Sequence, residues 1–491
     1  MKPMISAKTH QFLAFWSWLA CLLLLFSGPG PTLAAEHDSA SRLHSAWQDF
    51  IDDLRAAERT LLDERHHPPR ATDRVLADGY RYLLAHLNRE IEMAIRADPK
   101  FPEFFRSMDM LRKWTGENPD TMYLKAPIDS TGFYEVVIRA QNTREWRLGG
   151  AVIPGRKAPR LVIFQTITGV PGYTGELAEM QNCKNQTLDF VTGSSLKADG
   201  ENQYRILIGP EKPPGYSGNF LYSVKELQCK SSGVTAEARA NLLAVREVFS
   251  DWKNEIPLDM TITRLDSKGG NRPPHNAEQV AELIEALGDR VGKQIRFWNL
   301  VMEFPMEMTG DRNGDGKRSV PVNGINQPAT PFTAGGVAGA RQLYASGIFD
   351  LQADEALIIK MIAPVEPYYV GFQLNNLWME GPDQQNFSSS LTGFQNPVFA
   401  AATRYYIISS TDPGVQGWVD TTGLERGFHT MRFVFQVDPP EDQLPVLEAS
   451  LVKLDDLDSV LPEHYPRVTE AQRREAIATR QEHIKMRWRN Y

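Results

Sequence analysis

Cysteine is scarce in this sequence. There are three in 491 residues, and Cys21 lies in an apolar stretch near the N-terminus. Cys183 and Cys229 have no neighbouring histidine or further cysteine to complete a ligand set, which argues against a zinc site built on them. In an oxidising compartment such a pair favours one disulfide. Two buried thiols are the alternative.

Long apolar runs are equally rare. The one near the N-terminus, Phe12–Phe26, follows the basic residues Lys2 and Lys8 and precedes a glycine- and proline-rich segment with small residues after it. This layout is typical of a secretory signal, and the run is shorter than the roughly 20 residues that span a bilayer. We therefore predict a signal peptide over residues 1–35 and a periplasmic or secreted protein with no transmembrane span after cleavage. A short membrane anchor is the alternative.

An excess of basic residues is also missing. The formal net charge is −8, whereas a nucleic-acid-binding protein needs a basic face. The short basic segment near the C-terminus is interrupted by acids and is interpreted as a solvated helix face. The sequence has no G-x-S-x-G elbow, no H-E-x-x-H, no P-loop and no G-x-G-x-x-G that opens a helix. No cofactor other than calcium is indicated.

Periodicity divides the chain into helical and strand-rich parts. Apolar residues at helical spacing predict helices over 39–63 and 73–97, the second capped by Thr72 or Asp73. Short strand-like runs separated by turns, without long helices between them, predict antiparallel sheets. The expected parts are a signal peptide (1–35), an N-terminal helical layer (36–112), a first β region (113–230), a helical insert with helices over 235–254 and 277–301 (231–345), a second β region (346–440) and a C-terminal extension with a helix over 469–489 (441–491).

The fold class predicted from this pattern is α+β. Antiparallel sandwich or open-barrel regions are accompanied by N-terminal, central and C-terminal helices. The strand candidates in the first β region include 133–140, 146–153 and 160–167. Because the helical insert lies between the two β regions in sequence, we expect their strands to share one composite core.

A first polar cluster lies at Asn118-Pro119-Asp120, followed by Tyr123. Proline fixes φ, and Asx side chains bond to nearby backbone amides, so this segment predicts a turn. A structural cap is one interpretation. The other is that Asn118 binds a ligand while Asp120 and Tyr123 act as general base and proton donor.

A second cluster lies between Pro367 and Arg432, where polar side chains stand among aromatic ones. Burying such groups without partners costs about 1–3 kcal/mol each, so they must form a network or line a pocket. Asp420 is a further catalytic candidate, and we expect it to pair with Arg426 or Arg432. The predicted ligand-binding residues of this cluster are Asn375, Trp378, Trp418, Arg426 and Arg432.

A third cluster is the segment DRNGDGKRS. Asp311, Asn313 and Asp315 match positions one, three and five of an EF-hand calcium loop, but Val322 stands where position twelve requires a bidentate carboxylate. A calcium site at these three residues and a solvated turn both remain open.

Six segments resemble a bacterial family known as domain of unknown function 1214, often found beside domain of unknown function 1254. They are DGYRYLLAHLN, DPKFPEF, NPDTMY, FQLNNLWME, DPGVQGWVDTTGLERG and RFVFQ, in one order over most of the mature chain. The resemblance implies a jelly-roll-like sandwich in the C-terminal part, with helices around it. It implies no catalytic residues, because the family has no assigned reaction.

Three functions are consistent with the sequence. The first is an exported protein that binds a polar or saccharide-like ligand in a cleft. The second is a hydrolase or lyase that uses Asp and Tyr as acid–base groups. The third is a structural interaction protein of the cell envelope. The sequence leaves the reaction, the ligand and the oligomeric state open.

Overall fold

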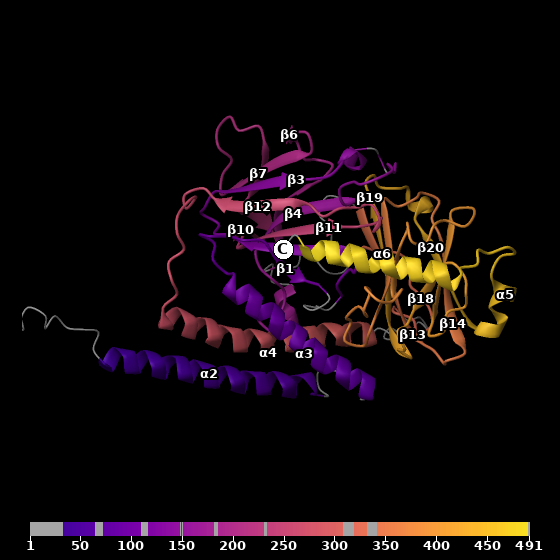
Figure 1. The fold of residues 1–491 in the computed structure, drawn as a ribbon, viewed down its shortest axis with the longest axis horizontal. Helices are drawn as coiled ribbons and strands as arrows, with labels where there is room; N and C mark the ends of the chain where they lie inside the picture. The colour runs from indigo at the N-terminus through magenta and orange to yellow at the C-terminus, as the bar shows by residue number, and fades with distance from the viewer. Residues whose placement is uncertain are drawn as a thin grey trace, which may run out of the picture.

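The computed structural model describes residues 33–63, 72–109, 116–147, 149, 151–180, 185–229, 233–307, 319–330 and 341–489. It is an α+β structure with mostly antiparallel sheets and with helices near its N-terminus, at its centre and at its C-terminus (Figure 1). The predicted fold class is confirmed. None of the helices in these ranges has the length and apolar character needed to cross a bilayer.

The first β-sandwich consists of two sheets packed over one core. One sheet has the strand order β1 (Phe105–Met108), β2 (Thr121–Pro127), β11 (Leu242–Val248), β4 (Leu161–Ile167) and β5 (Thr187–Thr192). The other has the order β12 (Asp259–Arg264), β3 (Tyr134–Arg139), β7 (Gln203–Gly209) and β6 (Ala198–Gly200), with β8 (Asn219–Tyr222) paired to β7. A hairpin, β9 (Val224–Gln228) and β10 (Thr235–Arg239), lies beside them. Alternate residues such as Leu124, Val136 and Phe164 fill the core between the sheets.

The second β-sandwich is built in the same way. One sheet has the order β13 (Arg341–Asp350), β19 (Arg426–Phe435), β15 (Tyr369–Asn375) and β16 (Ser390–Thr392); the other has the order β18 (Trp418–Asp420), β17 (Thr403–Ser409), β14 (Glu355–Ile362) and β20 (Val446–Lys453). Its core contains Phe372, Tyr406 and Phe433 and is separate from that of the first sandwich. The expectation of one composite core is therefore wrong, because each pair of sheets closes on its own apolar faces.

Helices cover one side of the first sandwich and connect the two (Figure 1). Helix α2 (Leu33–Leu61) packs along α4 (Ala277–Glu307), with α3 (Asp73–Ile95) beside them. Thr72 accepts a hydrogen bond from the backbone N of Val75, which confirms the predicted N-cap. The shorter helices are η2 (Arg144–Arg147), η3 (Leu177–Met180), η4 (Glu441–Gln443), η5 (Leu454–Asp456) and α5 (Leu457–Val460).

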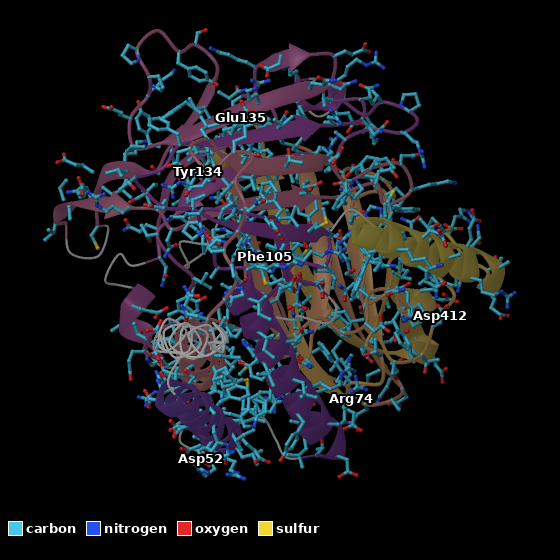
Figure 2. The ribbon with its side chains drawn as sticks, turned by 60° about the vertical axis from the view of Figure 1, so that its left-hand side comes forward. Asp52, Arg74, Phe105, Tyr134, Glu135 and Asp412 are labelled. Carbon is cyan, nitrogen blue, oxygen red and sulfur yellow. The ribbon has the colours of Figure 1, made fainter. Side chains whose placement is uncertain are left out.

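The C-terminal helix α6 (Glu470–Arg489) contacts both sandwiches. Near its start Arg473 donates two hydrogen bonds of 3.0 Å to Asp412 of the second sandwich, the residue marked beside this helix in Figure 2. Near its end the backbone oxygen of Trp488 accepts a hydrogen bond of 2.6 Å from Arg106 of the first sandwich. The helix therefore bridges the interface between the two sandwiches.

Two predictions of secondary structure are wrong. Residues 235–254 form strands β10 and β11 instead of a helix, because Leu242–Val248 is paired on both sides, with β2 and with β4. Residues 146–153 do not form a strand where they are described, because Glu145 and Trp146 turn inward in helix η2. The strands of the first sandwich consequently run to Arg264, beyond the boundary predicted at residue 230.

Helix α3 is held against the second sandwich by Trp378. The indole Nε1 donates to the backbone oxygen of Val75 at 2.9 Å, and its ring stacks on Tyr82 with centroids 5.4 Å apart. A Cβ at Gly79 would lie 2.6 Å from the indole ring. The glycine is therefore required by the close approach of the indole.

We predict that Gly79→Ala lowers the free energy of unfolding by about 1–3 kcal/mol, because overpacking outweighs the gain in helix propensity of about 1 kcal/mol. Gly292→Ala in α4 is the matched control, since a Cβ there meets nothing within 4 Å. That variant should be as stable as the wild type or slightly more stable. Urea unfolding measures both, and equal effects of the two substitutions would contradict the packing argument.

Candidate functional site

The turn Asn118–Asp120 of the first sandwich is inserted against strand β15 of the second. The Asn118 Nδ2 donates to the Tyr369 hydroxyl at 2.9 Å, and that hydroxyl donates to Asp120 Oδ2 at 2.6 Å. Within the turn, the backbone N of Asp120 donates to Asn118 Oδ1 at 3.0 Å. All three side chains are buried. The segment is thus an Asx turn that also joins the two sandwiches.

Arg432 and Gln373 extend this network along β19 and β15. Arg432 donates to the backbone oxygen of Gly116 at 2.9 Å and to the Gln373 side-chain oxygen. The Gln373 Nε2 donates to the backbone oxygen of Glu117 at 2.8 Å and to Asn375 Oδ1 at 3.0 Å. The predicted residues Asn375 and Arg432 therefore lie at the same interface as the turn. The polar atoms named here already form hydrogen bonds with other groups of this chain.

Helix α6 adds two buried arginines to this interface. Arg487 donates to the backbone oxygen of Pro119 at 2.8 Å, and Arg480 donates to that of Gln384 at 3.1 Å. Burial raises the pKa of Asp120, while its bond from Tyr369 and the positive charges of Arg487 and Arg480 oppose that rise. The interpretation of the C-terminal basic segment as a solvated face is wrong, because these arginines point into the interface.

A second cluster of polar side chains lies on the outer face of the sheet that contains β2 and β11. Tyr123 and Lys125 of β2 point away from the core of the first sandwich, and Arg246 of β11 is the strand partner of Tyr123. The Arg246 guanidinium lies 5.8 Å from the centre of the Tyr123 ring. Helix α3 contributes Arg89 and Glu90, which form an ion pair of 3.3 Å. We call Arg89, Lys125 and Arg246 the cationic cluster.

Tyr123 connects the cationic cluster to the turn. Its hydroxyl accepts a hydrogen bond of 3.0 Å from the backbone N of Asn118, and its charge interactions include Arg246, Arg432 and Tyr344 of the second sandwich. Tyr123, Arg246 and Tyr344 are half-buried, whereas Lys125 and Arg89 are buried. Side chains from both sandwiches therefore reach solvent here, beside a buried polar interior.

The predicted acid–base pair is not in direct contact. Asp120 is bonded to Tyr369, and the Tyr123 hydroxyl is bonded to the backbone of Asn118. Burial raises the pKa of Tyr123 and raises that of Tyr369 well above its usual value. A catalytic role for Asp120 and Tyr123 stays a prediction that these bonds do not favour.

Trp418 and Asp420 are bonded within the second sandwich. The Trp418 Nε1 donates to Ser409 Oγ at 3.1 Å. Asp420 Oδ1 accepts from the backbone N of Thr422 at 2.7 Å, and burial raises the pKa of Asp420. Among the contacts of the described residues, neither side chain bonds to the turn Asn118–Asp120. The structure therefore brings the two sequence clusters together only in part.

Two other predicted residues have partners away from the turn Asn118–Asp120. Arg426 pairs with Asp350 at 3.7 Å instead of with Asp420, because β13 places Asp350 opposite it in the sheet. Trp378 packs on α3, as described above. The calcium candidates Asp311, Asn313 and Asp315 lie outside the described residues, and within the described ranges no group of three or more His, Cys, Asp or Glu side chains is suited to a metal ion.

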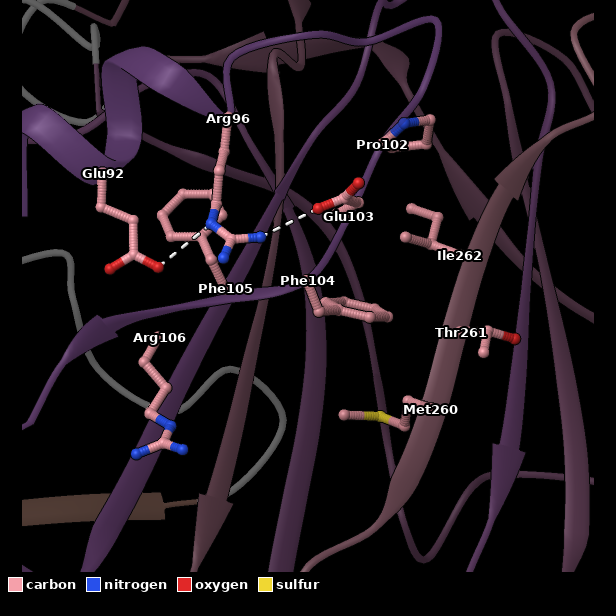
Figure 3. Close-up of a pocket in the computed structure, with 10 residues that line it drawn as sticks. All are labelled: Glu92, Arg96, Pro102, Glu103, Phe104, Phe105, Arg106, Met260, Thr261 and Ile262. Carbon is pink, nitrogen blue, oxygen red and sulfur yellow. Dashed lines mark hydrogen bonds and ion pairs between the residues drawn. The ribbon is translucent and has the colours of Figure 1, made fainter. Parts of the chain in front are cut away.

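A cavity of about 370 Å³ lies at an edge of the first sandwich, away from the predicted residues. Figure 3 shows Arg96 between Glu92 and Glu103, with ion pairs of 3.1 and 2.9 Å. Phe104 and Met260 line its apolar side. Arg96 pairs with both glutamates, and with Arg106 the lining carries two acidic and two basic side chains, so it offers a ligand no excess charge.

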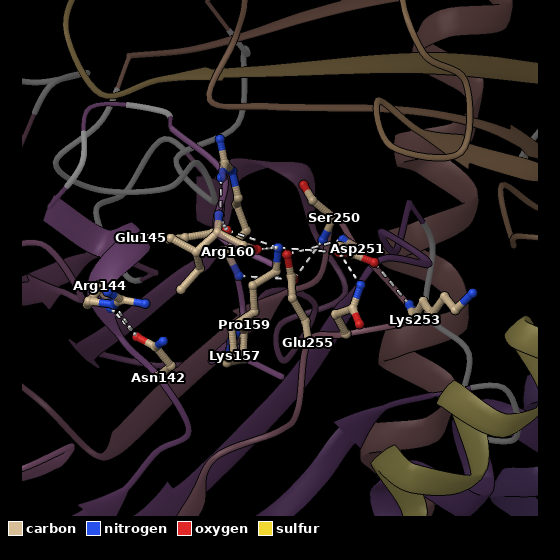
Figure 4. A network of polar contacts seen from close by, with 12 residues as sticks. Asn142, Arg144, Glu145, Lys157, Pro159, Arg160, Ser250, Asp251, Lys253 and Glu255 are labelled. Atoms are coloured by element: carbon tan, nitrogen blue, oxygen red, sulfur yellow. Dashed lines mark hydrogen bonds and ion pairs between the residues drawn. The ribbon is translucent and has the colours of Figure 1, made fainter. Parts of the chain in front are cut away.

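A smaller cavity of about 40 Å³ lies where the sandwiches meet, between Arg160 and Tyr368. Next to it is a buried ion network, in which Glu145 contacts both Lys157 and Arg160 at 2.9 Å (Figure 4). Arg160 also donates to the backbone oxygen of Tyr368 at 2.9 Å. This network joins the sandwiches but leaves room for little more than one water molecule.

Buried Glu247 gives stability a pH dependence. Burial raises its pKa from 4.5 to about 8, although its Oε2 accepts a bond of 2.8 Å from the backbone N of Leu258. Between these pH values the folded state holds a proton that the unfolded state has released. The contribution of Glu247 is therefore complete below about pH 4.5 and is lost as pH rises through about 8.

We predict that Glu247→Gln flattens the loss of stability between pH 5 and 8, by up to about 1.4 kcal/mol per pH unit. The amide keeps an acceptor for Leu258 but cannot ionise. Urea unfolding at several pH values measures the slope, with exposed Glu448→Gln as the control. Parallel slopes for Glu247→Gln and the wild type would contradict the assignment. Glu255, whose pKa burial raises to about 7, retains its own share of the slope in both proteins.

The sequence interpretation missed several residues of the interface. Lys125 and Arg246 stand at outward positions of strands whose inward positions are apolar, and this alternation was a usable signal. Tyr369 begins the buried strand β15 directly after Tyr368, and nothing in the sequence distinguishes the two tyrosines. Arg487 was not predicted, because helix α6 has no apolar stripe that would indicate its buried face. The helix lacks such a stripe because the surface that it covers is lined by polar groups of both sandwiches.

Comparison with known proteins supports the fold. No protein-family model matches the chain, and no curated protein matches it, so the resemblance to domain of unknown function 1214 stays a prediction. The crystal structure of an uncharacterized protein from Burkholderia cenocepacia is similar, with a TM-score of 0.65 and 23% identity over 85% of this chain and 99% of that one. The VPA0106 protein from Vibrio parahaemolyticus aligns with a TM-score of 0.38 and 11% identity over 82% of this chain and all of that one. The fold of this chain is thus similar to that of the Burkholderia protein.

Proposed function

We propose that this protein is an exported binding protein that holds a small polar ligand between its two β-sandwiches. The observation that carries the proposal is the meeting of half-buried Tyr123, Arg246 and Tyr344, from both sandwiches, beside a buried polar interior. Ligand sites at the junction of two structural units typically combine aromatic rings with a few fixed polar groups. Domain of unknown function 1214 is the family we propose for it.

The tyrosines would contact the ligand from opposite sides. Tyr344 accepts a hydrogen bond of 3.0 Å from Gln342 and lies under the Arg432 guanidinium, 5.2 Å from its ring centre. Its ring is therefore fixed by residues of its own sandwich, as Tyr123 is fixed by the Asn118 backbone. Such pre-positioned rings lose little conformational freedom when a ligand binds.

A ligand screen tests this proposal. Saccharides and small organic acids are added to the purified protein, and the rise in melting temperature is measured. Tyr123→Phe and Tyr344→Phe should each raise the dissociation constant of a bound compound by roughly tenfold or less, because each variant loses one hydrogen bond to the ligand. Tyr80→Phe is the control, because Tyr80 is exposed on α3 and bonds to Glu58. Equal affinities in all three variants would show that the ligand does not bind at Tyr123 and Tyr344.

Export predicts that Cys183 and Cys229 form a disulfide. Cys229 is buried, while Cys183 lies outside the described residues, so the pairing stays a prediction. Alkylation of the unfolded, unreduced protein should add no mass at either cysteine, and alkylation after reduction should add two labels. Mass spectrometry of the exported protein also gives its N-terminus, which we expect near Ala35. Two labels without reduction would contradict the disulfide.

A further inference from the structure

The cavity around Arg96 lies at the open side of the first sandwich. Strands β1 and β12 are each the last strand of their sheet in the described part of the chain, and both contribute to the lining. Phe104 and Met260 point toward one another from the two sides (Figure 3) and belong to the buried core between the sheets. One wall of the cavity is therefore an extension of the apolar core. Its apolar residues are Pro102, Phe104, Phe105, Met260 and Ile262.

A second wall of the cavity is charged and lies nearer to the surface. Arg96 pairs with Glu92 at 3.1 Å and with Glu103 at 2.9 Å. The side chains of Arg96 and Glu103 are 38% and 57% exposed, whereas the apolar side chains of the first wall are mostly buried. Exposed ion pairs contribute little to stability, so a ligand can replace the Arg96–Glu103 pair at small cost. Arg96 then keeps Glu92, and Glu103 keeps Arg272, which approaches it at 4.0 Å.

The balance of charge on this wall determines the class of ligand. The lining carries two acidic and two basic side chains. An anion or a cation would bring a charge that the lining does not compensate, and a wholly apolar ligand would desolvate the ion pairs without replacing them. A zwitterion exchanges one ion pair for two, because its carboxylate accepts hydrogen bonds from Arg96 while its ammonium group donates to Glu103.

We propose that this cavity binds a free α-amino acid with a large apolar side chain. The ligand carboxylate bonds to Arg96, its ammonium group bonds to Glu103, and its side chain lies against Phe104 and Met260. The cavity of about 370 Å³ is near the lower end of the range typical of small-molecule sites, about 300–1,000 Å³, so it favours a ligand of this size over a lipid or a longer peptide. None of its lining residues belongs to the site proposed between the sandwiches. It is therefore a second, independent ligand site.

The test compares an amino acid with two analogues that each lack one charge. L-Leucine and L-phenylalanine are titrated by calorimetry at neutral pH, together with the matching carboxylic acids without the amino group and the matching amines without the carboxylate. We expect at least one amino acid to bind at least about tenfold more tightly than both of its analogues, because each analogue loses one ion pair with the wall. L-Alanine should bind at least about tenfold more weakly than that amino acid, because its methyl group leaves most of the apolar wall uncovered.

Substitutions locate the site. Arg96→Met should abolish the preference for the amino acid over its amine, and Glu103→Gln should abolish the preference over its carboxylic acid. Arg55→Met is the matched control, because Arg55 forms an exposed ion pair with Asp52 on α2, and it should change neither preference. A merely structural role for Arg96 would alter the affinities for all three compounds together.

Three results would overturn this inference. One is an analogue with a single charge that binds as tightly as its amino acid. Another is the failure of both amino acids to bind at millimolar concentration. The third is binding whose preferences are unchanged in Arg96→Met and Glu103→Gln, with melting curves that show both variants are folded. If one variant is unfolded, the other decides, and if both are, the wild-type comparison with the analogues decides. None of these results affects the site proposed between the sandwiches, which its own ligand screen tests.

Discussion

Replacing Glu145 by alanine is expected to lower the free energy of unfolding by about 3–5 kcal/mol. Glu145 contacts Lys157 and Arg160 at 2.9 Å each, and its Oε1 also accepts a bond of 2.7 Å from the backbone N of Ile153. Lys157 and Arg160 are almost fully buried. Without Glu145, Arg160 loses the carboxylate that it contacts at 2.9 Å, whereas Lys157 keeps Asp251 at 3.3 Å.

The control for this prediction is an ion pair at the surface. Glu448→Ala removes the partner of Lys360, with which it forms a pair of 2.9 Å in which both side chains are partly exposed. Exposed pairs contribute about 1 kcal/mol or less. Guanidinium unfolding measures both variants. A cost for Glu145→Ala no larger than that for Glu448→Ala would show that the buried network does not stabilise the junction.

The second large effect is expected at Asp120. Asp120→Ala removes the acceptor of the Tyr369 hydroxyl and the negative charge that faces Arg432, Arg480 and Arg487. Breaking a buried charge interaction from one side costs about 3–5 kcal/mol. We expect this loss in the free energy of unfolding, measured by urea at neutral pH.

Asp120→Asn separates the two causes. The amide oxygen still accepts from Tyr369, but the negative charge beside the arginines is gone. The asparagine variant should therefore be less stable than the wild type and more stable than Asp120→Ala. Two variants of equal stability would assign the whole effect to charge. A fully stable Asp120→Ala would mean that the turn does not hold the sandwiches together.

Local signals in the sequence predicted much of the fold. The Thr72 cap, the helix near residues 469–489 and strands such as β3, β4 and β17 depend on capping, breakers and alternation within one segment. The segment Leu242–Val248 was assigned to the wrong class because charged Arg246 and Glu247 interrupt its apolar residues. Its strand conformation is set by pairing with β2 and β4, which are distant in sequence.

The site was predicted in part for the same reason. Polar residues without an obvious local partner, such as Asn118, Asn375 and Arg432, do converge on one interface, because each needs a hydrogen-bond partner once buried. Trp418 and Asp420 satisfy that need locally instead. The cationic cluster escaped prediction, because only the packing of α3 on the sheet places Arg89 beside Lys125.

Hydrogen–deuterium exchange tests most directly whether a ligand lies between the two sandwiches. The wild type is compared without ligand and with the compound that binds most tightly in the ligand screen. We predict slower exchange in peptides from both sandwiches, covering β2, β11 and β13, and little change in β14 and β20. Protection confined to one sandwich, or to the cavity around Arg96, would contradict the account.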